Sequence, residues 1–215
     1  MSQQEFWNSV AATKTFSHPL DLSRLASLVS RDARILDFGC GYGRLCRELR
    51  SAGYSNITGV DPSSAMIDRA QAENPGVAFQ VVDGQTLPCA AASFDVVLLF
   101  SVLTCIVDNG EQRALVREIE RVLQRGGIVY VSDILLQEDE RNRRRYEEGT
   151  RTFGQYGVFE LEPGVRFRHL SRLWVEELMS GFVPLDFVEI DVTTMNGNPA
   201  KGFQFWGAKR RADRS

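Results

Sequence analysis

The fold of this chain is indicated most clearly by the stretch Ile35-Leu36-Asp37-Phe38-Gly39-Cys40-Gly41-Tyr42-Gly43-Arg44. Its apolar beginning predicts a buried strand, and the alternating glycines predict a turn that leads into a helix. Glycine adopts positive φ and has no Cβ, so a ligand can approach the backbone of such a turn closely. The helix that follows offers free N–H groups at its N-terminus. We therefore expect a ligand site here, with a tight strand–helix turn and no ligand as the alternative.

Two carboxylates follow at the ends of the next two predicted strands. Asp61 ends a strand at 57–60, 20 positions beyond Gly41, where an acid can accept hydrogen bonds from both hydroxyls of a ribose. Asp83 ends a strand at 78–82, where it is placed to accept from an adenine amino group. Either acid alone could cap a strand end. Together with the glycine turn, they favour a ligand that contains ribose and adenine.

The hydrophobic pattern alternates short strands with amphipathic helices up to about residue 133. Strands are expected at 33–38, 57–60, 78–82, 94–100 and 128–132, and Gly126-Gly127 is expected to end the helix before the last of these. Such alternation predicts a parallel sheet that is covered by helices on both faces. We therefore predict an α/β fold with a doubly wound, Rossmann-like sheet.

The pattern changes after Asp133. A charged helix at 137–150 and an aromatic, glycine-rich segment at 151–170 predict a cap, and a helix at 171–180 follows. Strands at 187–192 and 202–208 flank a loop rich in turn residues, which predicts a terminal antiparallel hairpin. We expect one domain over 1–215, divided into N-terminal lid helices (1–30), a ligand-binding core (33–136), an inserted cap (137–170) and a C-terminal helix and hairpin (171–209).

Composition excludes several classes of protein. The 215 residues are 43% hydrophobic, which is typical of a globular chain, and 25 Lys and Arg against 28 Asp and Glu give a net charge of −3. This balance disfavours a nucleic-acid partner, and we interpret the arginine run at 141–145 as a solvated helix face. The four cysteines and two histidines show no metal-ligand spacing, so no metal is expected. No apolar run predicts a membrane span or a signal peptide, which favours a cytoplasmic protein.

The ordered set of motifs resembles that of the class I S-adenosylmethionine-dependent methyltransferases. The resemblance covers about residues 33–136 and implies a seven-stranded sheet whose last strand is antiparallel. The matching stretches are Leu36-Asp37-Phe38-Gly39-Cys40-Gly41-Tyr42-Gly43, Gly59-Val60-Asp61-Pro62-Ser63 with Met66, Asp83-Gly84 with Leu87-Pro88, Ser93-Phe94-Asp95-Val96-Val97, and Arg121-Val122-Leu123 with Gly126-Gly127. A nicotinamide-dependent dehydrogenase would need a small residue where Arg44 stands.

The resemblance implies S-adenosylmethionine as cofactor, with S-adenosylhomocysteine as product. Asp61 would hold the ribose, Asp83 the adenine amino group, and the backbone of 39–41 the methionine moiety. Met66 and Phe100 could instead be filling the core. The full set of residues expected to bind the cofactor is Trp7, Asp37, Gly39, Cys40, Gly41, Asp61, Pro62, Met66, Asp83, Gly84, Gln85 and Phe100.

The methyl acceptor is expected to be a small molecule. Methyltransferases of base amines or glutamine amides typically carry Asn/Asp-Pro-Pro-aromatic after the fourth strand, whereas this chain has Phe100-Ser101-Val102-Leu103. The aromatic cap favours a flat, aromatic or heteroaromatic acceptor, unless these rings form only the core of the cap. Acceptor-pocket candidates are Trp7, Phe16, His18, Tyr146, Phe153, Tyr156, Phe159 and His169.

His169 is our candidate general base, because histidine titrates near neutral pH, and Tyr156 is the second catalytic candidate. A packed histidine without a catalytic role is the alternative. The leading hypothesis is thus methyl transfer to N, O or S of a small aromatic metabolite, by in-line positioning. The alternative is a non-catalytic S-adenosylmethionine-binding module or partner subunit. The chain is expected to be a monomer or a homodimer.

Overall fold

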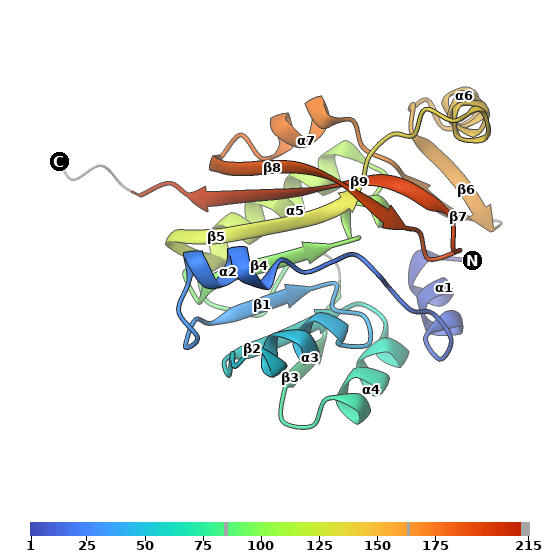
Figure 1. Cartoon of the computed structure of the whole chain (residues 1–215). Coiled ribbons are helices and arrows are strands. Elements are labelled where there is room, and N and C mark those ends of the chain that lie inside the picture. The colour runs from blue at the N-terminus through green and yellow to red at the C-terminus, as the bar shows by residue number, and fades with distance from the viewer. Residues whose placement is uncertain (84–85, 163, 212–215) are drawn as a thin grey trace.

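The computed structural model describes residues 1–83, 86–162 and 164–211 (Figure 1). Its main sheet has seven strands, and the prediction of a doubly wound α/β fold with a terminal hairpin is confirmed. The first five strands in the spatial order are parallel to one another, and β9 pairs antiparallel with both β5 and β8. The spatial order is β3 (Ala78–Val81), β2 (Ile57–Asp61), β1 (Ile35–Phe38), β4 (Phe94–Phe100), β5 (Leu123–Ile134), β9 (Pro199–Lys209) and β8 (Phe182–Thr193).

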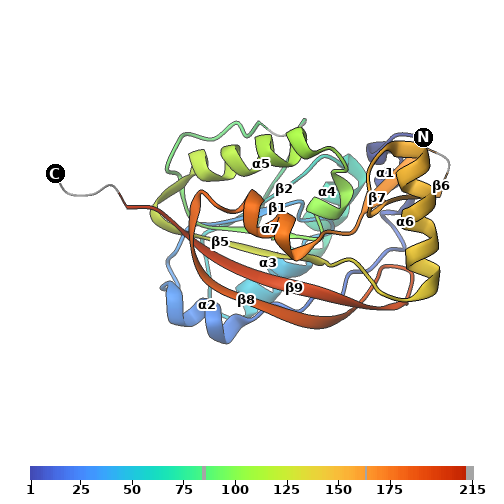
Figure 2. The ribbon, with the colours of Figure 1, turned by 90° about the horizontal axis from the view of Figure 1, so that it is seen from above.

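The central strands are buried on both faces of the sheet, and neighbouring residues of each strand point to opposite sides. In β1, Ile35 packs into the core under α2 (Leu22–Leu28), α3 (Arg44–Ser51) and α4 (Ser64–Glu73). Leu36 packs into the other core, under α5 (Asn109–Val122) and α7 (Arg172–Leu178). Figure 2 shows α5 and α2 on opposite sides of the sheet.

Several strand boundaries differ from the sequence-based expectation. β5 begins at Leu123, because α5 already ends at Val122, so Gly126-Gly127 lies inside the strand and does not end the helix. β8 and β9 are each much longer than expected, since they pair with each other along almost their whole length. A long antiparallel partner extends a strand beyond the part that its own hydrophobic pattern indicates.

The cap is built from α6 (Glu140–Phe153) and a two-stranded sheet of β6 (Val158–Glu162) and β7 (Val165–Arg168), against which α1 (Gln3–Val10) packs. All of them lie at the same end of the molecule (Figure 1). The strands β6 and β7 were not predicted. The core of the cap consists of Phe6, Tyr146, Phe159, Val165 and Phe167.

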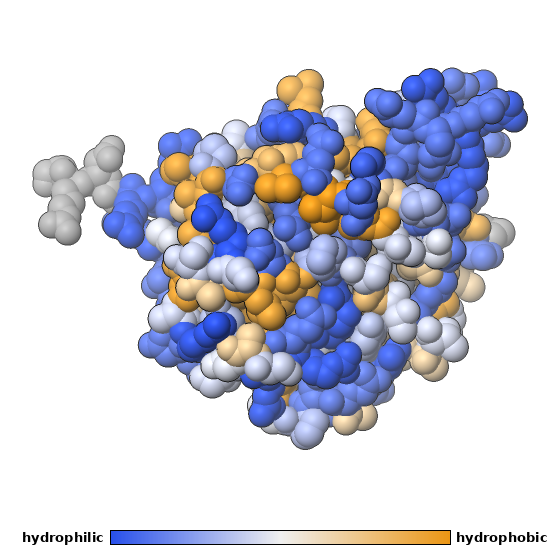
Figure 3. All heavy atoms as spheres, in the orientation of Figure 1, coloured by the Kyte–Doolittle hydropathy of each residue, from blue (hydrophilic) through white to orange (hydrophobic). Residues whose placement is uncertain are grey.

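The outer face of α6 is hydrophilic, as the surface at the upper right of Figure 3 shows. Arg143 and Arg144 are exposed there, and Arg144 forms an ion pair with Glu140. Among the helices of the described ranges, none is both long and apolar enough to cross a membrane.

Candidate cofactor and acceptor site

A cavity of about 490 Å³ lies at the carboxyl ends of the parallel strands. Its walls come from the turn after β1, the ends of β2 and β4, the N-terminal segment, the cap and the loop between β8 and β9. This is the edge of a doubly wound sheet at which ligands bind, and the volume is in the range of small-molecule sites.

The glycine turn forms the floor of this cavity. Gly39, Gly41 and Gly43 all have positive φ, at 72°, 51° and 78°. A Cβ on Gly39 would overlap Val102 Cγ2, and one on Gly41 would lie 3.0 Å from Phe16 Cε2. The alternating glycines are therefore required both by the backbone conformation and by the close approach of neighbouring side chains.

Asp61 is buried next to this turn and fixes its position. Its Oδ2 accepts a hydrogen bond from the Gly41 N–H (2.9 Å), and its Oδ1 accepts one from the Ser63 N–H (2.8 Å). Ser63 is the N-cap of α4, so the carboxylate connects the glycine turn to the start of that helix. Burial raises the pKa of Asp61, while the two N–H donors act in the opposite direction. Each carboxylate oxygen retains a lone pair with which it can accept from a ligand hydroxyl.

Asp37 supplies a second buried carboxyl at the end of β1. Cys46 Sγ donates to its Oδ2 (3.4 Å), but its Oδ1 is buried without any hydrogen-bond partner. Burial raises the pKa of Asp37 to about 7. An unsatisfied buried acceptor in a cavity wall indicates a missing donor. An ammonium group, such as the one in the methionine part of S-adenosylmethionine, would satisfy it.

The other residues expected to bind the cofactor fall into three groups. Six line the cavity together with Asp37, Asp61 and Gly41: Trp7, Gly39, Cys40, Pro62, Met66 and Phe100. The acceptor-pocket candidate Phe16 lines it as well. Asp83 is exposed and does not line the cavity. Gly84 and Gln85 lie outside the described residues.

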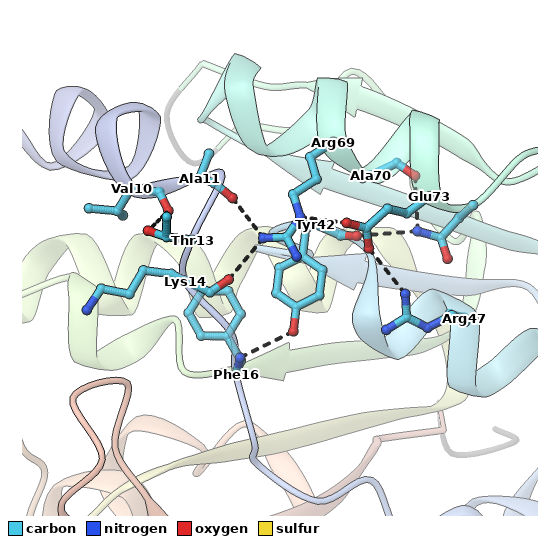
Figure 4. A network of polar contacts seen from close by, with 11 residues as sticks. Val10, Ala11, Thr13, Lys14, Phe16, Tyr42, Arg47, Arg69, Ala70 and Glu73 are labelled. Carbon is cyan, nitrogen blue, oxygen red and sulfur yellow. Dashed lines mark hydrogen bonds and ion pairs between the residues drawn. The ribbon is translucent and has the colours of Figure 1, made fainter.

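The N-terminal segment is held over the glycine turn by Arg69 of α4 (Figure 4). Arg69 Nη1 donates to the carbonyl oxygens of Ala11 (2.8 Å) and Lys14 (3.0 Å), and its Nε donates to Glu73 (2.6 Å). The guanidinium also lies over the ring of Tyr42, which stacks on Phe16. Arg69 thus ties the segment that carries Trp7 and Phe16 to the core.

Arg69→Ala is expected to weaken S-adenosylhomocysteine binding by up to about 30-fold, because two hydrogen bonds to the segment are lost, each contributing about 1 kcal/mol. Calorimetric titration measures this. Arg47→Ala is the matched control, since Arg47 also pairs with Glu73 (3.2 Å) but makes no hydrogen bond to the N-terminal segment. Equal affinity in Arg69→Ala and the unmodified protein would show that the segment does not contribute to the site.

At the cap end of the cavity lies the His169 ring. Its Nδ1 is 2.6 Å from Tyr146 Oη, which also accepts from the Gln137 N–H (3.2 Å). The Tyr146 oxygen has a second lone pair, so it can accept from Nδ1–H, and Nε2 is then the acceptor that faces Arg145 Nη2 at 3.4 Å. Burial lowers the pKa of His169 to about 3, so the ring is neutral. A general base needs a free lone pair, which the neutral ring has on one of its two nitrogens.

Tyr156 is not brought into the cavity. Its side chain is 48% exposed, and its ring packs edge-on against Tyr146 at 5.3 Å between centroids. The tyrosine that contacts His169 is Tyr146, because it lies on the inner face of α6. Phe153 also stays outside the lining, while Phe159 and His18 belong to it.

Several lining residues had no sequence signal. Gln4 Nε2 donates to the Pro62 carbonyl oxygen (2.8 Å), and Gln3 Nε2 donates to that of Cys105 (3.2 Å). Arg141, Asn142 and Arg145 reach the cavity from α6. The loop at 193–200 also contributes residues to the cavity wall. Its position follows from the sheet topology, because β9 runs antiparallel to β5 and begins where β5 ends. Within the described ranges, no group of His, Cys, Asp or Glu is arranged to hold a metal ion.

The fold, the glycine turn and the buried Asp61 at the end of β2 resemble the cofactor site of a methyltransferase. Residues 36–131 match the family model described as "Methyltransferase domain". A crystal structure of an S-adenosylmethionine-dependent methyltransferase from Methanosarcina mazei superposes with a TM-score of 0.82 at 27% identity, covering 89% of this chain and 99% of that one. The family match, the superposition and the curated relatives together support a class I S-adenosylmethionine-dependent methyltransferase.

Two curated relatives differ in the atom that their names give as methylated. The ubiquinone/menaquinone biosynthesis C-methyltransferase UbiE of Campylobacter jejuni is 33% identical over 122 residues, which are 54% of this chain and 51% of that protein. The O-methyltransferase resE of Aspergillus sclerotiorum is 29% identical over 174 residues, 78% of this chain and 61% of that protein. The chain spans about half the length of the first of these relatives.

Proposed function

We propose that this chain transfers the methyl group of S-adenosylmethionine to a small molecule bound under the cap. The observation that carries the proposal is the continuity of the cavity, which runs from Asp61 and Met66 past the glycine turn to Phe159 and His169. A cofactor at the turn and an acceptor at the cap would therefore share one enclosed space. This continuity favours an enzyme over a non-catalytic binding module. Such a module needs only the cofactor site and could have a cap with no space for an acceptor.

The cofactor supplies an already activated methyl group, so the chain has to orient the two partners and exclude water. Asp61 would accept from the ribose hydroxyls, and Asp37 would pair with the amino group of the methionine moiety. The backbone of 39–41 would contact that same moiety, and Pro62 and Met66 would pack near the adenine. Two buried acceptors support this assignment: Asp37 Oδ1, which has no hydrogen-bond partner, and the Asp61 carboxylate, whose oxygens each accept one backbone N–H and can accept further.

The acceptor would be flat and aromatic or heteroaromatic, because aromatic rings line its end of the cavity. Trp7, Phe16, Phe159 and Phe167 provide these rings, and Trp7 lies edge-on to Phe16 (5.8 Å) and Phe167 (6.1 Å). We propose N, O or S as the receiving atom, and the names of the two relatives add carbon. His169, which lines the cap end of the cavity, stays the candidate general base. From the sequence, we also propose that the protein has no nucleic-acid partner, that it is cytoplasmic and that it is a monomer or a homodimer.

Binding of S-adenosylhomocysteine is expected to release protons near pH 7. Asp37 is partly protonated in the free protein, with a pKa of about 7, and must be ionised to pair with the ammonium group. Affinity should therefore rise with pH up to about 7, by as much as about tenfold per pH unit, and then level off. Calorimetry in buffers of different ionisation enthalpy measures the proton release directly. The same release in Asp37→Asn would rule out Asp37 as its source.

The proposed activity is tested with S-adenosylmethionine that carries a deuterated methyl group. The protein is incubated with a metabolite extract from which macromolecules have been filtered, and mass spectrometry detects labelled products. A labelled small molecule is expected with the unmodified protein and not with a variant of Asp61. Label that appears only when protein or nucleic acid is added back would contradict a small-molecule acceptor.

A further inference from the structure

The cap end of the cavity contains an arginine whose charge is not compensated by an acid. Arg145, on the inner side of α6, is partly buried and lines the cavity. Its Cζ lies 3.5 Å from the centroid of the Phe159 ring, and its Nη2 lies 3.4 Å from His169 Nε2. Among the described residues, no carboxylate oxygen lies within 4.0 Å of its guanidinium nitrogens, and its buried Nε has no hydrogen-bond partner.

Burial without an acidic partner is costly for a cation, so such groups are usually paired. Arg145 is held in place by an aromatic face and a neutral imidazole, which position the guanidinium but do not neutralise it. Burial accordingly lowers the pKa of Arg145. The guanidinium of Arg145 is therefore available to bind an anion that is not part of the chain.

The charges of the cavity are separated between its two ends. Asp37 and Asp61 lie at the glycine turn, where the positively charged methionine part of the cofactor would bind. Arg145 and the exposed Arg141 lie at the cap, and Arg141 Nη1 donates to an amide oxygen, Asn198 Oδ1 (3.3 Å). Arg44, the third arginine of the lining, is already paired with Glu48 at 2.7 Å. The exposed Glu111 is the one further carboxylate of the described lining.

We infer that the methyl acceptor is a carboxylic acid and that Arg145 binds its carboxylate, with Arg141 contributing to the same positive end. A planar guanidinium matches the geometry of a carboxylate, because two parallel N–H···O bonds can form. Two buried amide oxygens in the same wall, Gln3 Oε1 and Asn142 Oδ1, have no donors. They would suit a hydroxyl or amino group on the same molecule. The inference rests on the proposed methyltransferase function and narrows its substrate class to flat hydroxy or amino carboxylic acids.

The test compares acids with their uncharged amides on protein saturated with S-adenosylhomocysteine. Matched pairs are salicylate and salicylamide, anthranilate and anthranilamide, and nicotinate and nicotinamide, each titrated calorimetrically. At least one acid is expected to bind about 10- to 100-fold more tightly than its amide, the range for a hydrogen bond to a charged group. Arg145→Gln should abolish this preference, and Arg145→Lys should restore part of it. Arg144→Gln, on the exposed face of the same helix, should leave it unchanged.

Each outcome decides between the alternatives. Unchanged S-adenosylhomocysteine binding by Arg145→Gln shows that this variant is folded. If the unmodified protein binds S-adenosylhomocysteine but no acid binds more tightly than its amide, or if the preference persists in Arg145→Gln, the carboxylate inference is wrong while the proposed function stands. If the unmodified protein does not bind S-adenosylhomocysteine, the proposed function itself fails.

Discussion

Asp61→Asn is expected to weaken S-adenosylhomocysteine binding by about 10- to 100-fold. The variant keeps the size of the side chain but replaces one acceptor oxygen by an NH₂ group. That group would face the N–H of either Gly41 or Ser63, both of which now donate to the carboxylate. It would also lose an acceptor for the ribose hydroxyls. Calorimetry measures the affinity, with Asp68→Asn on the exposed face of α4 as control.

Loss of affinity through misfolding has to be separated from loss of the ribose contact. The thermal unfolding midpoint of ligand-free Asp61→Asn provides this separation, because the fold is measured without the ligand. A small shift in the midpoint together with a large loss of affinity supports the ribose role. Unchanged affinity would remove Asp61 from the cofactor site.

Gly149→Ala is expected to displace the cap and abolish methyl transfer while leaving cofactor binding nearly intact. Gly149 faces β6 from the middle of α6, and a Cβ at this position would overlap the carbonyl oxygen of Val158. Backbone cannot move aside as a flexible side chain can, so α6 must shift away from β6, at a cost of about 1–3 kcal/mol. The shift would also move Arg145, Tyr146 and the acceptor end of the cavity.

Three measurements on Gly149→Ala test this separation: thermal unfolding, S-adenosylhomocysteine titration and product formation. Glu148→Ala is the control, since Glu148 is an exposed neighbour on the same helix. A fully active Gly149→Ala would show that the contact between α6 and β6 does not position the acceptor. Equal loss of cofactor binding and activity would show that the cap and the cofactor site are not separable.

The parallel core was predictable because its signals are local. Buried strands followed by amphipathic helices give a continuous pattern, and the glycines at 39, 41 and 43 are placed where positive φ is needed. The position of Asp61 beside Gly41 follows from parallel pairing, which puts the ends of β1 and β2 at one edge of the sheet.

The cap was less predictable, because its structure depends on contacts distant in sequence. The β6–β7 hairpin did have a local signal, since Pro163-Gly164 separates two stretches of alternating residues. No local signal in the sequence indicated that Arg145 lies on the inner side of the helix. Within the arginine run, Arg143 and Arg144 face solvent as a charged helix predicts. The exposed Arg141 and the partly buried Arg145, four positions apart, both line the cavity. Which side of α6 faces inward is set by Gly149 and Tyr146, whose roles depend on β6 and His169.

The central claim is that the glycine turn, Asp37 and Asp61 form a site for S-adenosylmethionine and not for another nucleotide. The measurement that tests it most directly is calorimetric titration of the purified protein with S-adenosylhomocysteine, with NAD as the comparison ligand. We expect one S-adenosylhomocysteine to bind per chain with micromolar affinity and NAD to show no binding. Tighter binding of NAD, or binding of neither ligand, would contradict the account.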